Sequence, residues 1–215
     1  MKTTSLKRGL FASKQVLVSI LLILSAGAAQ AEGSNWRFFG GLGLADGGDI
    51  IARGIIVTDG TNKELPFEIK AGGGTQYRAG VEYRLMERLS VQGSVGVSVA
   101  DPMGYNGSLT FSTIPVEVMA FVNLTEGARI GFGGRKTTAK MVGTGVSVNS
   151  PVIGTYESNG GVVVEAQYLF GNASGRAGTE RTQFGISLRM VDEKFTLNGF
   201  TIGGKHYEVG AAVYF

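Results

Sequence analysis

The last ten residues of the chain, HYEVGAAVYF from His206 to Phe215, decide the fold class. Counted back from the end, every second residue is apolar, and the residues between them are mixed in character. The apolar residues are Phe215, Val213, Ala211, Val209 and Tyr207. Because a strand directs successive side chains to opposite faces, the stretch predicts one apolar face and one mixed face. This pattern fits a strand between lipid and a lumen, and also an ordinary amphipathic strand, so the rest of the chain has to decide.

The same period of two recurs in seven earlier segments. The clearest is residues 89–99, whose length is close to the roughly 9–11 residues that a tilted strand needs to cross a bilayer. The other segments are residues 36–44, 75–85, 116–124, 128–135, 162–170 and 182–190. With the final strand they predict eight strands. Since Pro115 cannot donate to a strand ladder, we expect the paired part of its strand to begin at about Val116.

The connections between these segments alternate between short and long. Residues 86–88 and 125–127 are tight turns, whereas residues 100–108, Lys140–Asn159 and 192–205 contain longer loops. Residues 171–180 are polar and long for their side of the barrel. Short turns at one end and long loops at the other are typical of an up-and-down antiparallel transmembrane β-barrel. The predicted fold class is therefore all-β, an eight-stranded barrel of this kind.

The segment Ala45–Phe67 leaves two interpretations open. It contains Asp59-Gly60, a turn signal between two apolar runs. The first interpretation is a long hairpin that extends above the membrane into the medium. The alternative is two additional membrane strands, which would give a ten-stranded barrel.

The opposite rows of the same strands carry charges. A soluble all-β domain would bury the apolar rows and expose these charged ones. The opposite arrangement, with charges inside the barrel and Val, Tyr and Phe outside, is favoured only in lipid. A small barrel has an interior that side chains can fill, and buried charges must pair. We therefore predict a lumen charge network that plugs the barrel, and a selective path for a small solute is the alternative. Its members are Arg78, Glu82, Arg84, Glu117, Arg129, Arg135, Glu165, Arg189 and Glu208.

The N-terminus predicts export. Lys2, Lys7, Arg8 and Lys14 precede an apolar run from Val16 to Leu24, and small residues follow up to Ala31. This order is typical of a cleaved secretory signal peptide, and the apolar run is too short to span a membrane. We predict a signal peptide at residues 1–31 and an outer-membrane barrel at residues 32–215. The predicted location is the cell outer membrane.

The charge of the mature chain gives no support for nucleic-acid binding. The whole chain has 20 basic and 17 acidic residues, and the leader holds four of the basic ones and none of the acidic ones. Removing the leader leaves 16 basic against 17 acidic residues, so the net charge changes from +3 to −1. The chain has no cysteine, which excludes disulfides.

No motif for catalysis, cofactor binding or metal binding stands out, and we expect a protein that is not an enzyme. The one histidine, His206, lies in the last strand, where we expect a polar strand residue rather than a catalytic base. Asp46 and Asp49 could contact a calcium ion, but a solvated loop is the simpler interpretation. The glycine runs 72–74 and 131–134 are not followed by helices, so they are not phosphate loops. We expect them to relieve crowding in a curved barrel.

The placed strands resemble the small outer-membrane β-barrel proteins of Gram-negative bacteria, the OmpA/OmpX type. Within that class the chain is similar to an uncharacterised outer-membrane β-barrel family. The features are Gly47-Gly48-Asp49, Asp59-Gly60, Ala71-Gly72-Gly73-Gly74, Ile114-Pro115-Val116-Glu117 and the run from Gly131 to Gly134. The resemblance implies a fold and a location but no activity, and the ligand of the loops is unknown.

The chain end resembles the assembly signal of such barrels. Its residues are Tyr207, Val209, Ala211, Val213 and Phe215. The resemblance implies that outer-membrane lipid, the barrel-insertion machinery and periplasmic chaperones are partners during assembly.

Overall fold

The computed structural model describes residues 35–57, 64–104, 107–171 and 182–215. The predicted signal peptide, the Asp59-Gly60 turn and nearly all of the polar segment 171–180 lie outside these residues. Their predictions are therefore untested.

The described residues form twelve strands and one 3-10 turn. The strands are β1 (Trp36–Gly47), β2 (Ile50–Val57), β3 (Glu64–Lys70), β4 (Gly74–Met86), β5 (Leu89–Ala100), β6 (Met103–Gly104), β7 (Gly107–Asn123), β8 (Ala128–Gly143), β9 (Gly154–Phe170), β10 (Gln183–Leu197), β11 (Phe200–Gly203) and β12 (His206–Tyr214), and the turn η1 is Gly145–Ser147. Among the described residues, no helix has the length and apolar character needed to cross a bilayer.

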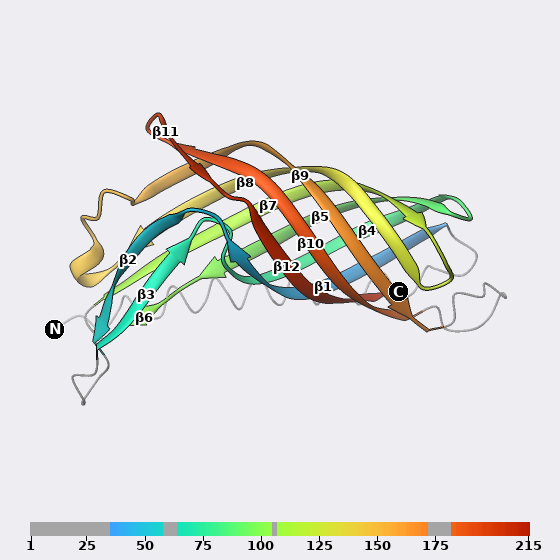
Figure 1. Cartoon of the computed structure of the whole chain (residues 1–215), viewed down its shortest axis with the longest axis horizontal. Coiled ribbons are helices and arrows are strands. Elements are labelled where there is room, and N and C mark those ends of the chain that lie inside the picture. The colour runs from blue at the N-terminus through green and yellow to red at the C-terminus, as the bar shows by residue number, and fades with distance from the viewer. Residues whose placement is uncertain (1–34, 58–63, 105–106, 172–181) are drawn as a thin grey trace.

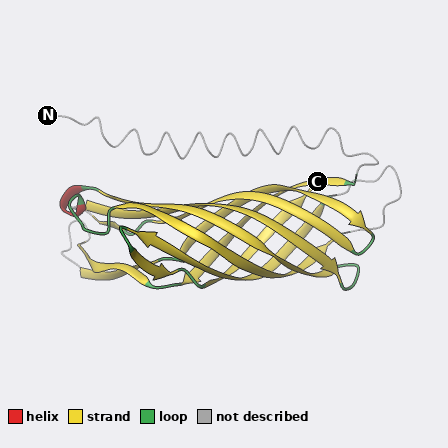
Figure 2. Cartoon of the chain, turned by 90° about the horizontal axis from the view of Figure 1, so that it is seen from above, coloured by secondary structure: helices red, strands yellow, loops and turns green. Residues whose placement is uncertain are grey.

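Eight of the strands close into an antiparallel barrel. Their order around the barrel is β1, β4, β5, β7, β8, β9, β10 and β12, and β12 returns to pair with β1 (Figures 1 and 2). The predicted eight-stranded fold is confirmed. β2 and β3 pair with each other in a separate two-stranded sheet, so the ten-stranded alternative is wrong. The hairpin spans Ile50–Lys70 rather than Ala45–Phe67, since β1 runs to Gly47, and its extension into the medium stays a prediction.

The barrel is packed inside out. Leu42, Phe132 and Phe184 lie on the outer surface and are each about 60 % exposed or more, whereas Phe39 and Phe121 are fully buried in the lumen. Because water would penalise so much exposed apolar surface, the outer wall requires a lipid environment. The protein is a membrane β-barrel.

The outward rows change from apolar to polar towards the loop end of the strands. Leu44 is followed by Asp46 on β1, Phe132 by Gly134 and Lys136 on β8, and Met190 by Asp192 on β10. This change marks the edge of the apolar band. β7, β8, β9 and β10 continue past it, so the barrel wall rises above the lipid.

The extended wall corrects the predicted loop boundaries. Lys140–Asn159 is not one loop, because β8 runs to Gly143 and β9 begins at Gly154. Likewise, residues 192–205 contain the end of β10, a two-residue turn and β11, and residues 100–108 contain β6 and the start of β7. The outward residues of these segments are polar because they face water, and this polarity made strands look like loops.

Pro115 lies inside β7, which begins at Gly107, so the predicted start at Val116 is wrong. Pairing between β5 and β7 is interrupted at this point, since Val95 pairs with Val116 but the next pair is Ser98 with Thr113. A proline is tolerated there because its missing donor falls at a break in the ladder.

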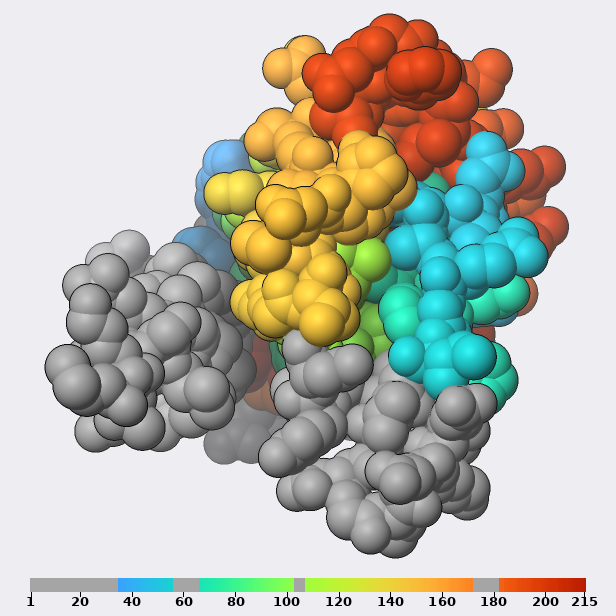
Figure 3. Space-filling view, turned by 90° about the vertical axis from the view of Figure 1, so that its left-hand side faces the viewer, coloured from blue at the N-terminus to red at the C-terminus, as the bar shows by residue number. Residues whose placement is uncertain are grey.

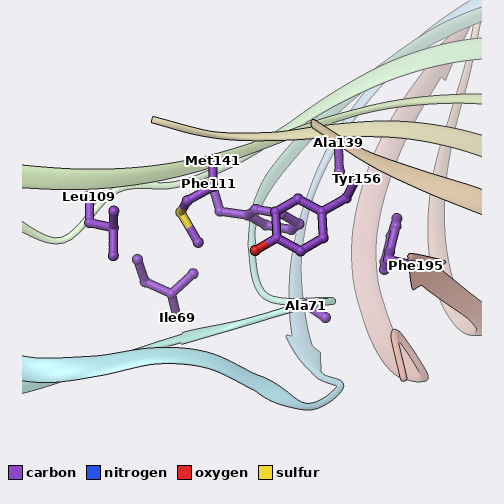
Figure 4. Close-up of a cluster of buried hydrophobic side chains, with 8 residues drawn as sticks. All are labelled: Ile69, Ala71, Leu109, Phe111, Ala139, Met141, Tyr156 and Phe195. Atoms are coloured by element: carbon purple, nitrogen blue, oxygen red, sulfur yellow. The ribbon is translucent and has the colours of Figure 1, made fainter. Parts of the chain in front are cut away.

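An apolar cluster closes the loop end of the barrel. It joins Ile69 of β3 to Leu109 and Phe111 of β7, Met141 of β8 and Phe195 of β10 (Figure 4). Figure 3 views this end, with β2 in cyan, the segment around η1 and the start of β9 in gold, and β11 in red around the mouth. The β2–β3 hairpin thus contributes side chains that cover the lumen.

Candidate functional site

The lumen contains eight of the nine charged residues that the sequence predicted for it. Arg84 is the exception, since it is exposed at the turn end of β4. The eight residues in the lumen are Arg78, Glu82, Glu117, Arg129, Arg135, Glu165, Arg189 and Glu208.

Arg189 is the centre of the network. From β10 its guanidinium reaches Glu117 of β7 at 2.6 Å, Glu165 of β9 at 3.1 Å, and Glu208 of β12. All four side chains are at most 4 % exposed. One arginine therefore ties together carboxylates from three other strands, across the whole width of the lumen.

Two further arginines extend this central group. Arg78 of β4 donates two hydrogen bonds to Glu165, at 3.1 and 3.3 Å. Arg135 of β8 lies 2.9 Å from Glu208 and 3.2 Å from Glu193. Each carboxylate in the group forms an ion pair with at least one arginine from a different strand.

A second group fills the turn end of the lumen. Glu82 forms ion pairs with Arg37 and, at 2.6 Å, with Arg129. Arg129 also donates a 2.9 Å hydrogen bond to the Tyr214 hydroxyl. Its guanidinium stacks 4.3 Å from the Phe121 ring centre, a cation–π contact that helps to stabilise a buried charge.

Two members of the network, Arg37 and Glu193, were not included in the prediction. The alternation of the first strand puts Arg37 on the inward row, but the prediction did not assign it to the charge network. Glu193 falls in the segment that was interpreted as a loop. The inward row of β10 runs through Gln183, Arg189 and Glu193 without a break, so extending the period of two would have found it.

The lumen charges balance. The ion pairs join five arginines and five glutamates, which are Arg37, Arg78, Arg129, Arg135, Arg189, Glu82, Glu117, Glu165, Glu193 and Glu208. Breaking one buried pair by removing a partner typically costs about 3–5 kcal/mol, because an uncompensated charge is left in a dry interior. The network therefore links strands across the lumen, and the loss of one side chain leaves its partner charge buried without compensation.

Glycines on the inward rows make room for the large side chains. Phe39 faces Gly80 across β1 and β4, and a Cβ at Gly80 would lie 2.6 Å from its ring. Phe121 faces Gly131 in the same way, and a Cβ there would overlap the ring. In the run 131–134, Gly131 and Gly133 thus relieve crowding, as the sequence analysis expected, whereas Gly134 is exposed and a Cβ there would meet nothing closer than 3.9 Å.

A small, partly open cavity of about 20 Å³ lies beside the ion-pair network. Gly41, Gly43 and Gly210 leave the space, and Arg78 and Arg189 line it. Its size suits a single water molecule, which needs about 10–15 Å³.

The carboxylates considered for calcium have other contacts. Asp46 accepts a 2.8 Å hydrogen bond from Lys70, which raises the pKa of the Lys70 ammonium, and Asp49 accepts one of 2.7 Å from the Gly203 backbone. Within the described ranges, no group of three or more potential ligands could hold a metal ion. Both ring nitrogens of His206 contact neighbours, Gly204 and Glu208.

Four of the predicted assembly residues lie on the outward row of β12, and Phe215 directly follows the strand. Tyr207 and Val209 are about 60 % exposed, and the Phe215 backbone exchanges hydrogen bonds with Phe38 at 2.9 and 3.3 Å. Ala211 and Val213 continue the same outward row between them. The chain end is therefore held in the seam that closes the barrel.

The comparisons with known proteins concern the fold alone. No protein-family model matches the chain, and no curated protein matches it. Similar solved structures include Ail of Yersinia pestis in complex with the heparin analogue sucrose octasulfate, with 12 % identity over 84 % of this chain and 99 % of that chain and a TM-score of 0.49. OprG of Pseudomonas aeruginosa is similar with 10 % identity, 86 % and 97 % coverage and a TM-score of 0.43.

The translocator domain of the autotransporter NalP from Neisseria meningitidis is similar with 10 % identity, 96 % and 97 % coverage and a TM-score of 0.36. Since these similarities are distant, the fold assignment is based on the strand pairing of the chain itself. That pairing has the closed eight-stranded form of the OmpA/OmpX type. The finer resemblance to one particular family stays a prediction.

Proposed function

We propose that the protein is an integral outer-membrane barrel with a closed lumen and a structural or surface-interaction role. The observation that carries the proposal is the ion-pair network around Arg189, which joins β7, β9, β10 and β12 in the middle of the barrel. A solute that crossed the lumen would have to separate these pairs. The apolar cluster around Phe111 and Met141 adds a second obstruction at the loop end.

The proposed location is supported by three independent features. The apolar outer wall needs lipid, the N-terminal leader predicts export, and the terminal Phe215 resembles a barrel assembly signal. On this proposal the partners during assembly are the lipid, the insertion machinery and periplasmic chaperones. Export of the chain with cleavage after Ala31 would test the leader.

The proposed interaction surface is the loop end of the barrel. The β2–β3 hairpin, the segment 144–153 and the β10–β11 turn lie there, above the apolar band. They expose Ile55, Val146 and Phe200, each at least 60 % exposed. Because single apolar side chains are common on protein surfaces, the proposal rests on the position of these segments above the apolar band rather than on the side chains themselves.

Conductance of the purified protein in planar bilayers tests the closed lumen. We expect little steady current from the wild type, and more current from Glu117→Ala and Glu165→Ala, which remove carboxylates from the centre of the network. Glu157→Ala is the matched control, because Glu157 is an exposed glutamate on β9 outside the lumen. Large, long-lived open channels in the wild type would favour the alternative, a small-solute channel.

We propose no catalytic role. His206 has both ring nitrogens engaged by Gly204 and Glu208, so a serine would have to displace one of them to form a nucleophile–base pair. Mass analysis of lipids from cells that overproduce the protein tests this proposal, and new lipid species that need His206 would contradict it.

A further inference from the structure

The seam that closes the barrel opens near the loop end. Pairing between β1 and β12 ends at Gly47 and His206, and Asp49 then makes two hydrogen bonds with Gly203. The Asp49 N–H donates to the Gly203 carbonyl at 2.7 Å, and the Gly203 N–H donates to the Asp49 carboxylate at 2.7 Å. Beyond this contact, among the described strands, β11 pairs with β10 alone and β2 with β3 alone. The strands that follow the seam towards the loop end are therefore not joined to each other.

The two strands of the β2–β3 hairpin differ in how their outer edges are protected. Every second residue of β3 is a proline or carries a charge, in the row Glu64, Pro66, Glu68 and Lys70. β2 has the sequence IIARGIIV, with Arg53 as its one charged residue and no proline. Proline and charged side chains are the usual means of blocking an exposed edge strand. The edge of β3 is therefore protected against strand addition, whereas the edge of β2 is not.

Pro66 indicates which backbone groups of β2 face this outer edge. It pairs with Ile55, and a proline has no N–H to donate to the neighbouring strand. This favours the kind of antiparallel pair in which both residues turn their N–H and C=O groups away from each other. Because such pairs alternate along the ladder, Arg53 also directs its backbone groups to the outer edge, whereas Gly54 directs its groups towards β3.

No strand in the described part of the chain pairs with the outer edge of β2. The strand passes close to β6, but no backbone hydrogen bond joins these two strands. The side chains of Ile50 and Ile55 are 39 % and 60 % exposed. The outer edge of β2 therefore combines unpaired backbone groups with apolar side chains, above the apolar band.

We propose that the outer edge of β2 binds an extended segment of another polypeptide, which adds to the β2–β3 hairpin as a third strand. This inference rests on the proposed surface-interaction role and names the kind of partner. The N–H and C=O groups of such an edge repeat about every 7 Å, a spacing that another extended backbone matches. Main-chain hydrogen bonds supply the affinity, and apolar side chains of the partner pack beside Ile55.

Peptide binding to the full-length barrel tests the proposal. The barrel is placed in phosphatidylcholine nanodiscs, where both of its ends are accessible whichever end faces the medium in the cell. The probe is a fluorescein-labelled peptide of alternating threonine and valine, about seven residues long. The control is the same peptide with N-methyl groups on alternate residues, which removes the donors that strand pairing needs. We expect fluorescence anisotropy to show binding of the first peptide and not of the second.

Amide hydrogen exchange, followed by NMR in the same nanodiscs, locates the binding edge. Without peptide, the N–H groups of Arg53 and Ile55 should exchange faster than that of Gly54, which faces β3. The peptide should slow the first two and leave Gly54 unchanged. Protection of Arg53 and Ile55 in a single barrel without peptide would show that the edge is already covered and overturn the proposal. Protection that appears only with two barrels per disc would identify a second copy as the occupant and overturn it as well.

Two variants separate strand addition from unspecific apolar binding. Ile55→Lys should weaken peptide binding by about tenfold, because it removes one aliphatic contact and places a charge on the edge. Val146→Lys is the matched control, since Val146 is an exposed apolar residue of the loop end outside the hairpin. The proposal is overturned if the first peptide does not bind, if both peptides bind equally, or if both variants weaken binding equally. None of these results affects the closed lumen, which conductance tests separately.

Discussion

Glu165→Ala should be among the most destabilising single substitutions in this barrel. Glu165 has no exposed surface, holds Arg78 by two hydrogen bonds, and lies 3.1 Å from the Nε of Arg189. Once it is removed, the nearest carboxylate to Arg78 is Glu117, at 4.0 Å. The guanidinium of Arg78 then has no direct hydrogen bond to a carboxylate in the dry centre of the lumen.

The expected cost is about 3–5 kcal/mol, the usual range for breaking a buried ion pair. This corresponds to a change of roughly two to four powers of ten in the unfolding equilibrium. Water that enters the space would lower the cost and loosen the plug. Glu117→Ala should cost less than Glu165→Ala, because Arg189 keeps Glu165 and Glu208 as partners when Glu117 is lost.

Reversible denaturant unfolding in lipid vesicles measures this cost. The one tryptophan of the chain, Trp36, lies at the turn end of β1 and is half exposed, so its fluorescence reports transfer out of lipid. Glu157→Ala, on the same strand but exposed to water, is the control and should change stability by less than about 0.5 kcal/mol. If Glu165→Ala unfolds at the same denaturant concentration as Glu157→Ala, the carboxylate is not paired in the lumen and the inferred network is wrong.

Three further predictions concern assembly, packing and the membrane. Deleting Phe215 should lower the amount of protein in the outer membrane while export and leader cleavage continue, as fractionation and immunoblotting would show; unchanged levels would rule out an assembly role. Gly131→Ala should destabilise the barrel by about 1–3 kcal/mol, because the new methyl group overlaps a buried phenylalanine ring. Gly93→Ala is its control in the same unfolding assay, since nothing lies within 4 Å of a Cβ there. Val118→Lys should cost about 2–4 kcal/mol in lipid and Thr138→Lys close to nothing, since only Val118 lies in the middle of the apolar band; equal effects would contradict the proposed lipid boundary.

The sequence predicted the faces of the strands better than their ends. The alternation from His206 to Phe215 correctly placed Glu208 and Tyr214 in the lumen and Val209 on the outer wall. A period of two is a local property, and the pleat of a strand fixes it residue by residue. The inside-out distribution of charge was therefore visible without a structure.

Strand ends depend on a boundary that the local pattern does not contain. Above the lipid, the outward residues Lys140 and Glu157 face water, so their rows resemble those of a loop. The inward rows of the same segments stay apolar, at Met141 and Tyr156, and alternate with the polar outward residues. This alternation indicates that the strands continue. A polar outward row alone therefore does not distinguish a loop from a strand that faces water.

The partners inside the lumen could not be predicted either. Arg189 meets Glu117 and Arg78 meets Glu165 across strands that are not sequence neighbours. Such pairs depend on the tilt and stagger of the closed barrel, which no single strand specifies. The exposed position of Arg84 has the same cause, because it follows from where the turn end of the barrel lies.

The most direct test of the inside-out, closed barrel is a nitroxide scan of β7 in lipid bilayers. The chain has no cysteine, so each label occupies one site. A label at Val118 should collide often with oxygen, which concentrates in lipid, and one at Thr110 should meet a water-soluble nickel complex above the apolar band. A label at Met119, one residue from Val118 but inside the lumen, should be shielded from both. Free access of the nickel complex to Met119, or a water-exposed Val118, would contradict the account.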